Sequence, residues 1–345
     1  ASTGTDSGWA KMVGNSVSAF NTSEPSVNLA DVKGQAGAKR AIEIAAAGGH
    51  SLLMVGPPGS GKSMLAHRFT GLLPALTVRE ALETASIASL AGRFQLTQWA
   101  ERPMRHPHHS ASAVALVGGG SPPRPGEISL AHQGVLFLDE LPEFPRAALE
   151  ALREPLESGS VTISRAALTS EFPARFQLIA AMNPCPCGYA GQVSSVENRG
   201  PVCRCTPDQV RRYVSKISGP LLDRIDLHIE VPRQNTSLVV SAPEGEKTSV
   251  VRDRCLRAMK LARSRQGCCN QALSGALLTE HCALNETALA YLTQVATHFA
   301  WSARGTHRVL KVARTIADLA NCDAIDTDHI AEAVQYRRTI DERQH

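Results

Sequence analysis

Residues 52–69, LLMVGPPGSGKSMLAHRF, decide the fold of this chain. A short apolar run at 52–55 leads into a glycine-rich turn, and a helix is predicted to start near Lys62. The turn matches G-x-x-x-x-G-K-[ST] in full, between a strand and a helix, which is the context that gives this pattern its meaning. Such a turn holds phosphates with backbone N–H groups and the N-terminus of the helix. We predict ATP or GTP binding, with a chance glycine-rich turn as the alternative.

The same stretch assigns individual roles around the nucleotide. Lys62 is expected to reach the β- and γ-phosphates, and the Ser63 hydroxyl is expected to bind Mg²⁺. The other residues expected to line the nucleotide come from the turn and the first helical turn: Gly56, Pro57, Pro58, Gly59, Ser60, Gly61 and Met64.

A second stretch supplies acidic groups. Residues 134–140, GVLFLDE, have the pattern of a buried parallel strand that ends in two acids. Ligands of open α/β sheets bind at the carboxyl ends of the strands. We therefore expect Asp139 to hold Mg²⁺, mostly through water, and Glu140 to polarise the attacking water. This indicates an ATPase rather than a passive binder; the alternative is an exposed acidic pair that only caps the strand.

The composition limits the rest of the chain. Its 345 residues indicate about two domains, and a hydrophobic share of 43% leaves ample material for a core. The net charge of +4 permits a polyanionic partner. An aromatic share of 4% argues against a nucleic-acid-binding surface on which bases stack mainly on aromatic rings. No apolar run reaches the roughly 18 residues of a membrane helix. Without a secretory signal, and with an odd number of cysteines, the chain is predicted to be cytoplasmic and to contact no membrane.

Several longer motifs resemble those of AAA+ ATPases. The segments VKGQAGAKRAIEIAAAGGH (32–50) and LLDRIDLHIEV (221–231) flank the nucleotide motifs. Three more, GGGSPPRPGEISLAHQGVLFLDELPEF (118–144), AAMNPCPCG (180–188) and HRVLKVARTIADL (307–319), are similar to the magnesium-chelatase-like group and its ComM family, which is linked to natural transformation. The resemblance covers about residues 29–338.

The resemblance implies an α/β fold with a P-loop NTPase core and a parallel sheet at 29–235, an inserted β-hairpin, and a zinc loop at 185–205. It also implies a linker at 1–28, a second linker with a basic helix at 236–275, and a helical lid over the nucleotide site at 276–345. Family members carry an additional N-terminal Lon-protease-like domain, so the chain is expected to be a fragment. Selectivity for ATP over GTP rests on the resemblance alone.

The family pattern assigns roles outside the two motifs. Asn183, after the strand FQLIAAMN, matches sensor 1, whose amide bonds the γ-phosphate or positions water. The alternative is a turn-forming Asn before Pro184. Arg224 matches an arginine finger that acts across a subunit boundary, and the alternative is a surface pair with Asp223 or Asp226.

Further positions follow from the same pattern. Arg304 matches sensor 2, with Arg308 one turn later as the reserve, and a solvated arginine is the alternative for either. Val32 and neighbouring backbone match the segment that contacts adenine, in a turn shaped by Gly34 and Gln35.

Two inserts interrupt the core. Residues 105–134 are too rich in Gly, Pro and His for a plain helix, and the family reading is an insert that sends loops into the pore of a ring. Its three histidines, His106, His108 and His109, do not have the spacing of a helical ligand face, so no metal site is predicted there.

The second insert is a hairpin. Strands at 161–164 and 175–181, with RAALTSEFP between them, resemble the β-hairpin inserted before sensor 1, with Arg165 facing the pore. A plain surface hairpin is the alternative.

The segment VVRDRCLRAMKLARSRQ (250–266) forms a basic helix with a single acid. It is either a phosphate-contacting face or a solvated helix. The apolar stripe predicted for it is Val251, Leu256, Met259 and Ala262. The sequence from 277 to 338 is helical throughout, and Asp326 or Thr327 is expected to cap the last helix.

The loop NPCPCGYAGQVSSVENRGPVCRCT (183–206) holds two Cys-x-Cys pairs: Cys185, Cys187, Cys203 and Cys205. Four sulfurs brought together suit a tetrahedral zinc site. A spacing of one residue is less common for zinc than two to four, so disulfides and unrelated thiols remain alternatives, although a reducing compartment makes disulfides improbable. The family resemblance implies a structural zinc at these positions. The loop ends at a helix capped by Thr206, with Pro207 at its first position.

These features together predict a hexameric, ATP-driven DNA translocase. The resemblance implies a branch-migration helicase of natural transformation and homologous recombination, with single-stranded or branched DNA as its partner. ATP, Mg²⁺ and structural Zn²⁺ are the predicted cofactors. A magnesium-porphyrin chelatase motor and a protease-associated protein remodeller are the alternatives, and the Cys-x-Cys pairs argue against the chelatase.

Overall fold

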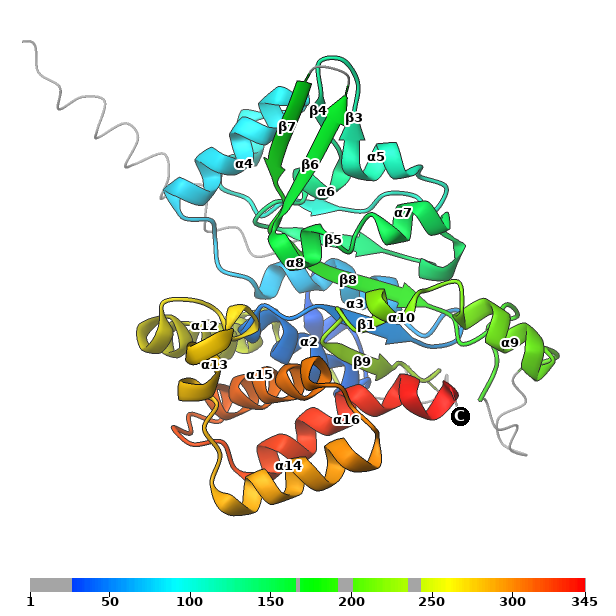
Figure 1. Cartoon of the computed structure of the whole chain (residues 1–345), viewed down its shortest axis with the longest axis vertical. Helices are drawn as coiled ribbons and strands as arrows, with labels where there is room; N and C mark the ends of the chain where they lie inside the picture. The colour runs from blue at the N-terminus through cyan, green and yellow to red at the C-terminus, as the bar shows by residue number, and fades with distance from the viewer. Residues whose placement is uncertain (1–26, 166–167, 192–200, 235–242, 345) are drawn as a thin grey trace, which may run out of the picture.

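The computed structural model describes residues 27–165, 168–191, 201–234 and 243–344. At its centre lies a five-stranded sheet of parallel strands in the order β2-β5-β8-β1-β9 (Figure 1). Its strands are β2 (Met104–Arg105), β5 (Val135–Leu138), β8 (Gln177–Met182), β1 (Leu52–Val55) and β9 (Leu227–Glu230). The predicted α/β fold with a parallel sheet is confirmed.

The side chains of the strands pack into two hydrophobic cores, one on each face of the sheet, because successive side chains of a strand point to opposite faces. Leu52 and Met54 join one buried cluster, whereas Leu53 and Val55 join the other. The first cluster is closed by α2 (Ala36–Gly48), α3 (Lys62–Phe69), α12 (Thr248–Gln266), α13 (Gly275–His281), α14 (Glu286–His298), α15 (Ala303–Leu319) and α16 (Thr327–Gln344). Short helices close the second: α5 (Ala113–Val117), α6 (Glu127–Leu130), α7 (Arg146–Glu150), α9 (Pro207–Val214) and α10 (Gly219–Leu222).

The insert at 105–134 is not a plain helix, as predicted. It runs through the end of β2, α5, the short ladder of β3 (Gly118–Gly119) and β4 (Arg124–Pro125), and α6. The helix α4 (Val78–Leu90) precedes it, and a capping box at Thr77 and Glu80 starts that helix.

The inserted hairpin pairs β6 (Ser160–Arg165) with β7 (Leu168–Pro173) and projects at the top of Figure 1, away from the C-terminal helices. The prediction of 175–181 as its second strand is wrong, since those residues belong to the central strand β8. The sequence pattern that would predict β7 is weak, because Phe172 is the main buried side chain of this strand. Its neighbours Glu171 and Pro173 are exposed. The predicted pore-facing side chain of Arg165 lies outside the described residues.

The buried stripe of the basic helix α12 matches the predicted one at Val251 and Ala262 but not at Leu256 and Met259. Leu256 and Met259 are only partly buried, and the buried positions are Thr248, Val251, Cys255, Ala258 and Ala262. The small side chains of this stripe let α12 lie close to α2, which is why a search for large apolar residues misplaces it.

A buried carboxylate joins the C-terminal helices to the sheet. Asp226, which precedes β9, is 3% exposed. Its Oδ2 accepts a hydrogen bond from the Ser51 backbone N–H at 3.0 Å and lies 3.6 Å from His50 Nδ1. Its Oδ1 accepts one from Arg308 Nη1 of α15 at 2.5 Å, and His50 Nε2 lies 2.8 Å from Thr315 Oγ1 on the same helix. These contacts hold α15 at the amino-terminal ends of β1 and β9.

The last helix reaches the same edge of the sheet. Arg337 of α16 donates to the carbonyl of Ile225 at 3.1 Å and to Asp223 at 2.7 Å. The region after residue 276 is helical, as predicted, and its role as a lid over the nucleotide site stays a prediction. Among the described helices, none has the length and apolar character that crossing a membrane requires.

The Asp226 network makes a prediction about stability. Although burial opposes ionisation, His50 and Arg308 hold the pKa of the Asp226 carboxyl well below its usual value. Its contribution is therefore complete above the unfolded pKa of about 3.9 and declines as the pH falls toward the folded pKa. The substitution Asp226→Asn leaves Arg308 unmatched and is expected to lower the free energy of unfolding by about 3–5 kcal/mol near pH 7.

Urea unfolding of wild type and variant measures this difference, which is expected to shrink below about pH 4. Asp208→Asn is the matched control, because Asp208 lies on the surface in an exposed pair with Arg211 and should contribute about 0–1 kcal/mol. Equal losses in the two variants would contradict the special role of Asp226.

Candidate nucleotide site

The phosphate turn has the predicted strand–loop–helix form. It leaves β1 at Val55 and enters α3 at Lys62. Gly59 and Gly61 have φ of +73° and +94°, which glycine adopts at low cost. At Gly56 a Cβ would lie 2.2 Å from the carbonyl oxygen of Val231, so this position accepts only glycine. The turn is thus shaped by its own glycines and by the end of β9.

The residues predicted to act on phosphate and metal lie together at the carboxyl edge of the sheet. Lys62 Nζ donates to the carbonyls of Gly56 at 2.7 Å and Pro57 at 2.9 Å and lies 3.3 Å from Asn183 Oδ1. Burial lowers the pKa of Lys62, while Asp139 and Glu140 oppose this shift.

The predicted magnesium ligands are in contact. The Ser63 hydroxyl donates to Asp139 Oδ2 at 2.6 Å. A hydroxyl and a carboxylate oxygen at this distance are the hard oxygen donors that Mg²⁺ prefers, together with water and phosphate oxygens. The donor set therefore fits the predicted ion.

Glu140 has a partner that sequence reasoning did not identify. Its Oε2 lies 2.8 Å from His109 Nδ1, and its backbone is left-handed, with φ of +55°. The His109 ring also contacts the His108 ring in a tilted arrangement, with ring centroids 4.1 Å apart. The H-P-H-H run drew attention as a metal pattern, but nothing in its spacing points to a carboxylate 31 residues later in the chain.

The segment expected to contact adenine lies beside the phosphate turn. Gln35 Nε2 donates to the Ser60 carbonyl at 3.1 Å and to the Pro232 carbonyl at 2.7 Å. Gly34 and Gln35 both have positive φ, of +63° and +53°, which bends the chain sharply before α2, and Val32 is 4% exposed.

The three predicted arginines lie at the opposite edge. Strands β1 and β9 run in register from Leu52 and Leu227 to Val55 and Glu230, and Arg224 precedes β9. A four-residue strand spans about 13 Å, so the length of β9 lies between Arg224, which precedes it, and the edge of the sheet that holds the P-loop. The sheet brings the residues that are predicted to act on phosphate and metal together and keeps these arginines apart from them.

Arg224 and Arg304 share one carboxylate. Arg224 Nη2 binds Glu157 Oε2, and Arg304 Nη2 binds Glu157 Oε1 at 3.2 Å. Arg224 is the main cause that lowers the pKa of Glu157. Glu157 lies in α8 (Pro155–Ser158), 67 residues before Arg224 in the chain, and no local pattern marks it.

The alternative pairing of Arg224 with Asp223 or Asp226 is wrong. Asp223 pairs with Arg337, and Asp226 pairs with Arg308. Arg308 also donates to the Arg224 carbonyl at 3.0 Å and is largely buried, so it is a structural contact rather than a solvated side chain.

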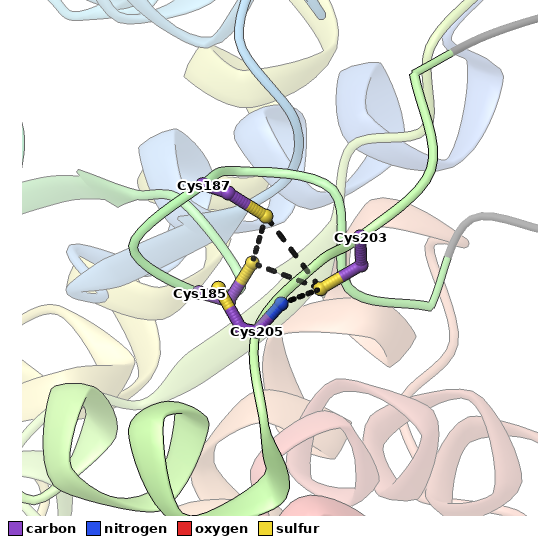
Figure 2. Close-up of side chains that lie close together, drawn as sticks. All are labelled: Cys185, Cys187, Cys203 and Cys205. Carbon is purple, nitrogen blue, oxygen red and sulfur yellow. Dashed lines mark hydrogen bonds between the residues drawn. The ribbon is translucent and has the colours of Figure 1, made fainter.

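The four loop cysteines converge on one point, as Figure 2 shows. Sγ of Cys185 lies 3.3 Å from that of Cys187 and 3.7 Å from that of Cys203, and Cys187 and Cys203 are 3.5 Å apart. The sulfur of Cys205 completes the cluster, and all four sulfurs lie within 4.8 Å of one another. Zinc–sulfur bonds of about 2.3 Å in a tetrahedron give sulfur separations of about 3.8 Å, so the donor set fits such an ion.

The electrostatics of this cluster also favour a cation. Burial opposes ionisation of Cys187, but the backbone N–H groups of Arg204 and Tyr189 lower its pKa to about 6. At Cys203 the backbone N–H of Cys205 favours the thiolate, yet burial and the neighbouring sulfurs raise its pKa to about 12. Four thiolates this close repel one another unless a metal ion balances them. The loop closes on α9, where Thr206 forms the predicted cap with Gln209.

The chain matches two family models in succession. Residues 28–239 match the model described as Magnesium chelatase, subunit ChlI, and residues 245–337 match its C-terminal model. The competence protein ComM of Haemophilus influenzae is 49% identical over 316 residues, which cover 91% of this chain and 60% of that protein. The uncharacterized protein YifB of Salmonella typhimurium is 48% identical over 312 residues, 90% of this chain and 60% of that protein.

A more distant relative is the DNA replication licensing factor Mcm2 of Drosophila melanogaster, 28% identical over 203 residues, which cover 55% of this chain and 19% of that protein. The chain spans about 60% of the length of the two bacterial relatives. Its first family model alone covers more than half of the chain, and the ComM resemblance inferred from the motifs is confirmed. The chain belongs to the magnesium chelatase ChlI family of AAA+ ATPases.

Proposed function

We propose that this chain is the motor region of a ring-shaped, ATP-driven DNA translocase that acts as a branch-migration helicase in transformation and recombination. One observation carries the ring: Lys62, Asp139 and Glu140 lie at the carboxyl edge of the sheet, whereas Arg224 lies at the amino edge. A single copy therefore holds two halves of two different sites. A neighbouring subunit supplies the missing half, and we propose a hexamer in the cytoplasm.

The catalytic assignments follow this division. We propose that Glu140 polarises the attacking water, Asn183 contacts the γ-phosphate, and Lys62 neutralises phosphate charge. Arg224 and Arg304 act on the nucleotide of the next subunit, since both bind Glu157 and share one surface. Arg308 is assigned to anchoring rather than to nucleotide contact, because Asp226 and the Arg224 carbonyl occupy it.

The DNA partner is supported by the relatives and by α12. Two relatives are named as a competence protein and a DNA replication licensing factor. Of the six basic residues of α12, two are used internally, because Arg254 binds Glu43 and Glu246 and Arg265 binds Asp318. The other four, which have no ion pair among the described contacts, are available to a polyanion: Arg252, Arg257, Lys260 and Arg263. We propose that this face and the β6–β7 hairpin contact the phosphate backbone.

Mixing two inactive variants tests the shared site. Arg224→Ala is expected to lower ATP turnover by about 10³-fold or more, and Glu140→Gln by about 10²–10⁴-fold. In a mixed ring, a Glu140→Gln subunit can offer its intact Arg224 to the intact site of an Arg224→Ala subunit. The mixture is therefore expected to recover a measurable part of wild-type turnover, and Lys62→Ala in place of Arg224→Ala is the control that should not recover. A mixture as inactive as its components would exclude action across subunits.

The DNA proposal is tested by steady-state ATP hydrolysis with single-stranded and forked DNA, together with mass photometry in an ATP analogue. Stimulation is expected, with a steep loss of DNA binding as salt rises, because phosphate contacts displace counterions. A discrete hexamer should form when DNA and nucleotide are both present. Hydrolysis that responds to a porphyrin-binding partner subunit but not to DNA would favour the chelatase motor, which the family description also allows. Stimulation by an unfolded polypeptide would favour a protein remodeller.

We further propose that the four cysteines hold structural Zn²⁺, with all four positions filled by protein. Elemental analysis is expected to give one zinc per chain. The substitution Cys203→Ser is expected to abolish this stoichiometry, whereas Cys322→Ser, at a cysteine outside the cluster, should preserve it. Reduced protein that is purified without chelator and contains no zinc would defeat the assignment.

A further inference from the structure

The cysteine loop contacts the phosphate turn at Gly188. Gly188 follows the first Cys-x-Cys pair, is buried, and has φ of +86°. A Cβ at Gly188 would lie 2.5 Å from Cδ and 2.8 Å from Cγ of Pro58. The backbone of the loop therefore lies directly against the proline ring at the tip of the turn, with no room for a methyl group between them.

The position of Gly188 is set by the cysteines. Its N–H donates to the Cys185 carbonyl at 2.9 Å, and the N–H of Ala190 donates to Cys185 Sγ at 3.3 Å. Cys185 is fully buried, and Cys187, whose sulfur lies 3.3 Å from that of Cys185, directly precedes Gly188 in the chain. A change in how the sulfurs are held is thus transmitted to Gly188 through one peptide unit.

The first residue of the phosphate turn is hydrogen-bonded to the end of strand β8, the strand from which the cysteine loop leaves. The Gly56 N–H donates to the Met182 carbonyl at 3.1 Å, and Lys62 Nζ lies 3.3 Å from Asn183 Oδ1. Cys185 follows Asn183 by two residues. Strand β8 therefore supports the base of the turn, and the loop that leaves β8 supports its tip at Pro58.

We propose that the cysteine cluster is a positioning element for the nucleotide, so that affinity for ATP depends on whether the four sulfurs hold their metal. The contact between Gly188 and Pro58 is the coupling point. This inference rests on the proposed metal and nucleotide sites. Coupling between two sites of one domain is typically 5–150-fold in affinity and is reciprocal. We expect removal of the metal to weaken nucleotide binding by about tenfold, and bound nucleotide to tighten metal binding by the same factor.

Two glycine substitutions separate this contact from general backbone strain. Gly188→Ala and Gly191→Ala both place a methyl group at positive φ, since Gly191 has φ of +79°. The methyl at 188 meets Pro58, whereas a Cβ at 191 has nothing within 4 Å among the described residues. With a fluorescent ATP analogue, Gly188→Ala is expected to raise Kd about tenfold and Gly191→Ala less than about twofold. The double variant Gly188→Ala/Pro58→Ala, which has room for the methyl, is expected to bind like Pro58→Ala alone.

Metal removal tests the coupling itself. The analogue is titrated into wild type and Pro58→Ala before and after treatment with a chelator, with circular dichroism and elemental analysis on each sample. Wild type is expected to lose about tenfold in affinity, and Pro58→Ala, which lacks the ring contact, less than about twofold. Folded, metal-free wild type that binds the analogue as tightly as the loaded protein would overturn the inference. Equal affinities of Gly188→Ala and Gly191→Ala for the analogue would also overturn the inference. This comparison tests the inference even if the metal-free protein unfolds.

The experiments distinguish failure of the coupling from failure of the proposed metal site or of the proposed nucleotide site. Protein that contains no metal as isolated contradicts the zinc assignment, and loaded protein that does not bind the analogue contradicts the proposed nucleotide site. Protein that binds both contradicts the coupling if chelation leaves its affinity for the analogue unchanged, or if Gly188→Ala and Gly191→Ala bind the analogue equally.

Discussion

The buried carboxylate of Asp226 is the contact on which the arrangement of the molecule depends. It binds the Ser51 backbone at the start of β1, lies beside His50 and accepts the Arg308 guanidinium from α15. A buried charge is tolerated only when such partners surround it. Since Asp226 precedes β9 and its partners come from the start of β1 and from one C-terminal helix, satisfying the charge fixes where the helical region meets the sheet.

This position has a consequence for the arginines. Arg308 binds Asp226 and the Arg224 carbonyl at once, so α15 cannot approach the sheet without bringing its first turn, with Arg304, next to Arg224. Glu157 then joins the two guanidinium groups. The parallel sheet acts as a spacer of about 13 Å between this pair and the phosphate turn. Incomplete sites at both edges are what a ring of identical subunits requires, and this supports the proposed assembly.

The local features of the site were predictable from the sequence, and the long-range ones were not. The phosphate turn, the strand that ends in Asp139, and the Thr206 cap are encoded in short windows where residue type and spacing determine backbone conformation. Strand β7 and half of the buried stripe of α12 differ from the prediction because small or polar side chains replace the expected apolar pattern there. The pairs formed by Glu157 and by His109 depend on the folded topology, and no periodicity in one chain records them.

The two adjacent acids at the end of β5 illustrate why environment, rather than residue type, separates roles. Asp139 accepts hydrogen bonds from the Ser63 hydroxyl at 2.6 Å and from the Glu140 backbone N–H at 2.9 Å, so its carboxylate is fixed toward the metal ligand. Glu140 has a left-handed backbone, which is costly for a residue other than glycine. Its side chain pairs with His109, and half of it is exposed. A fixed carboxylate suits an ion, and an exposed one that can leave a histidine suits the activation of water, which supports the proposed division of work between them.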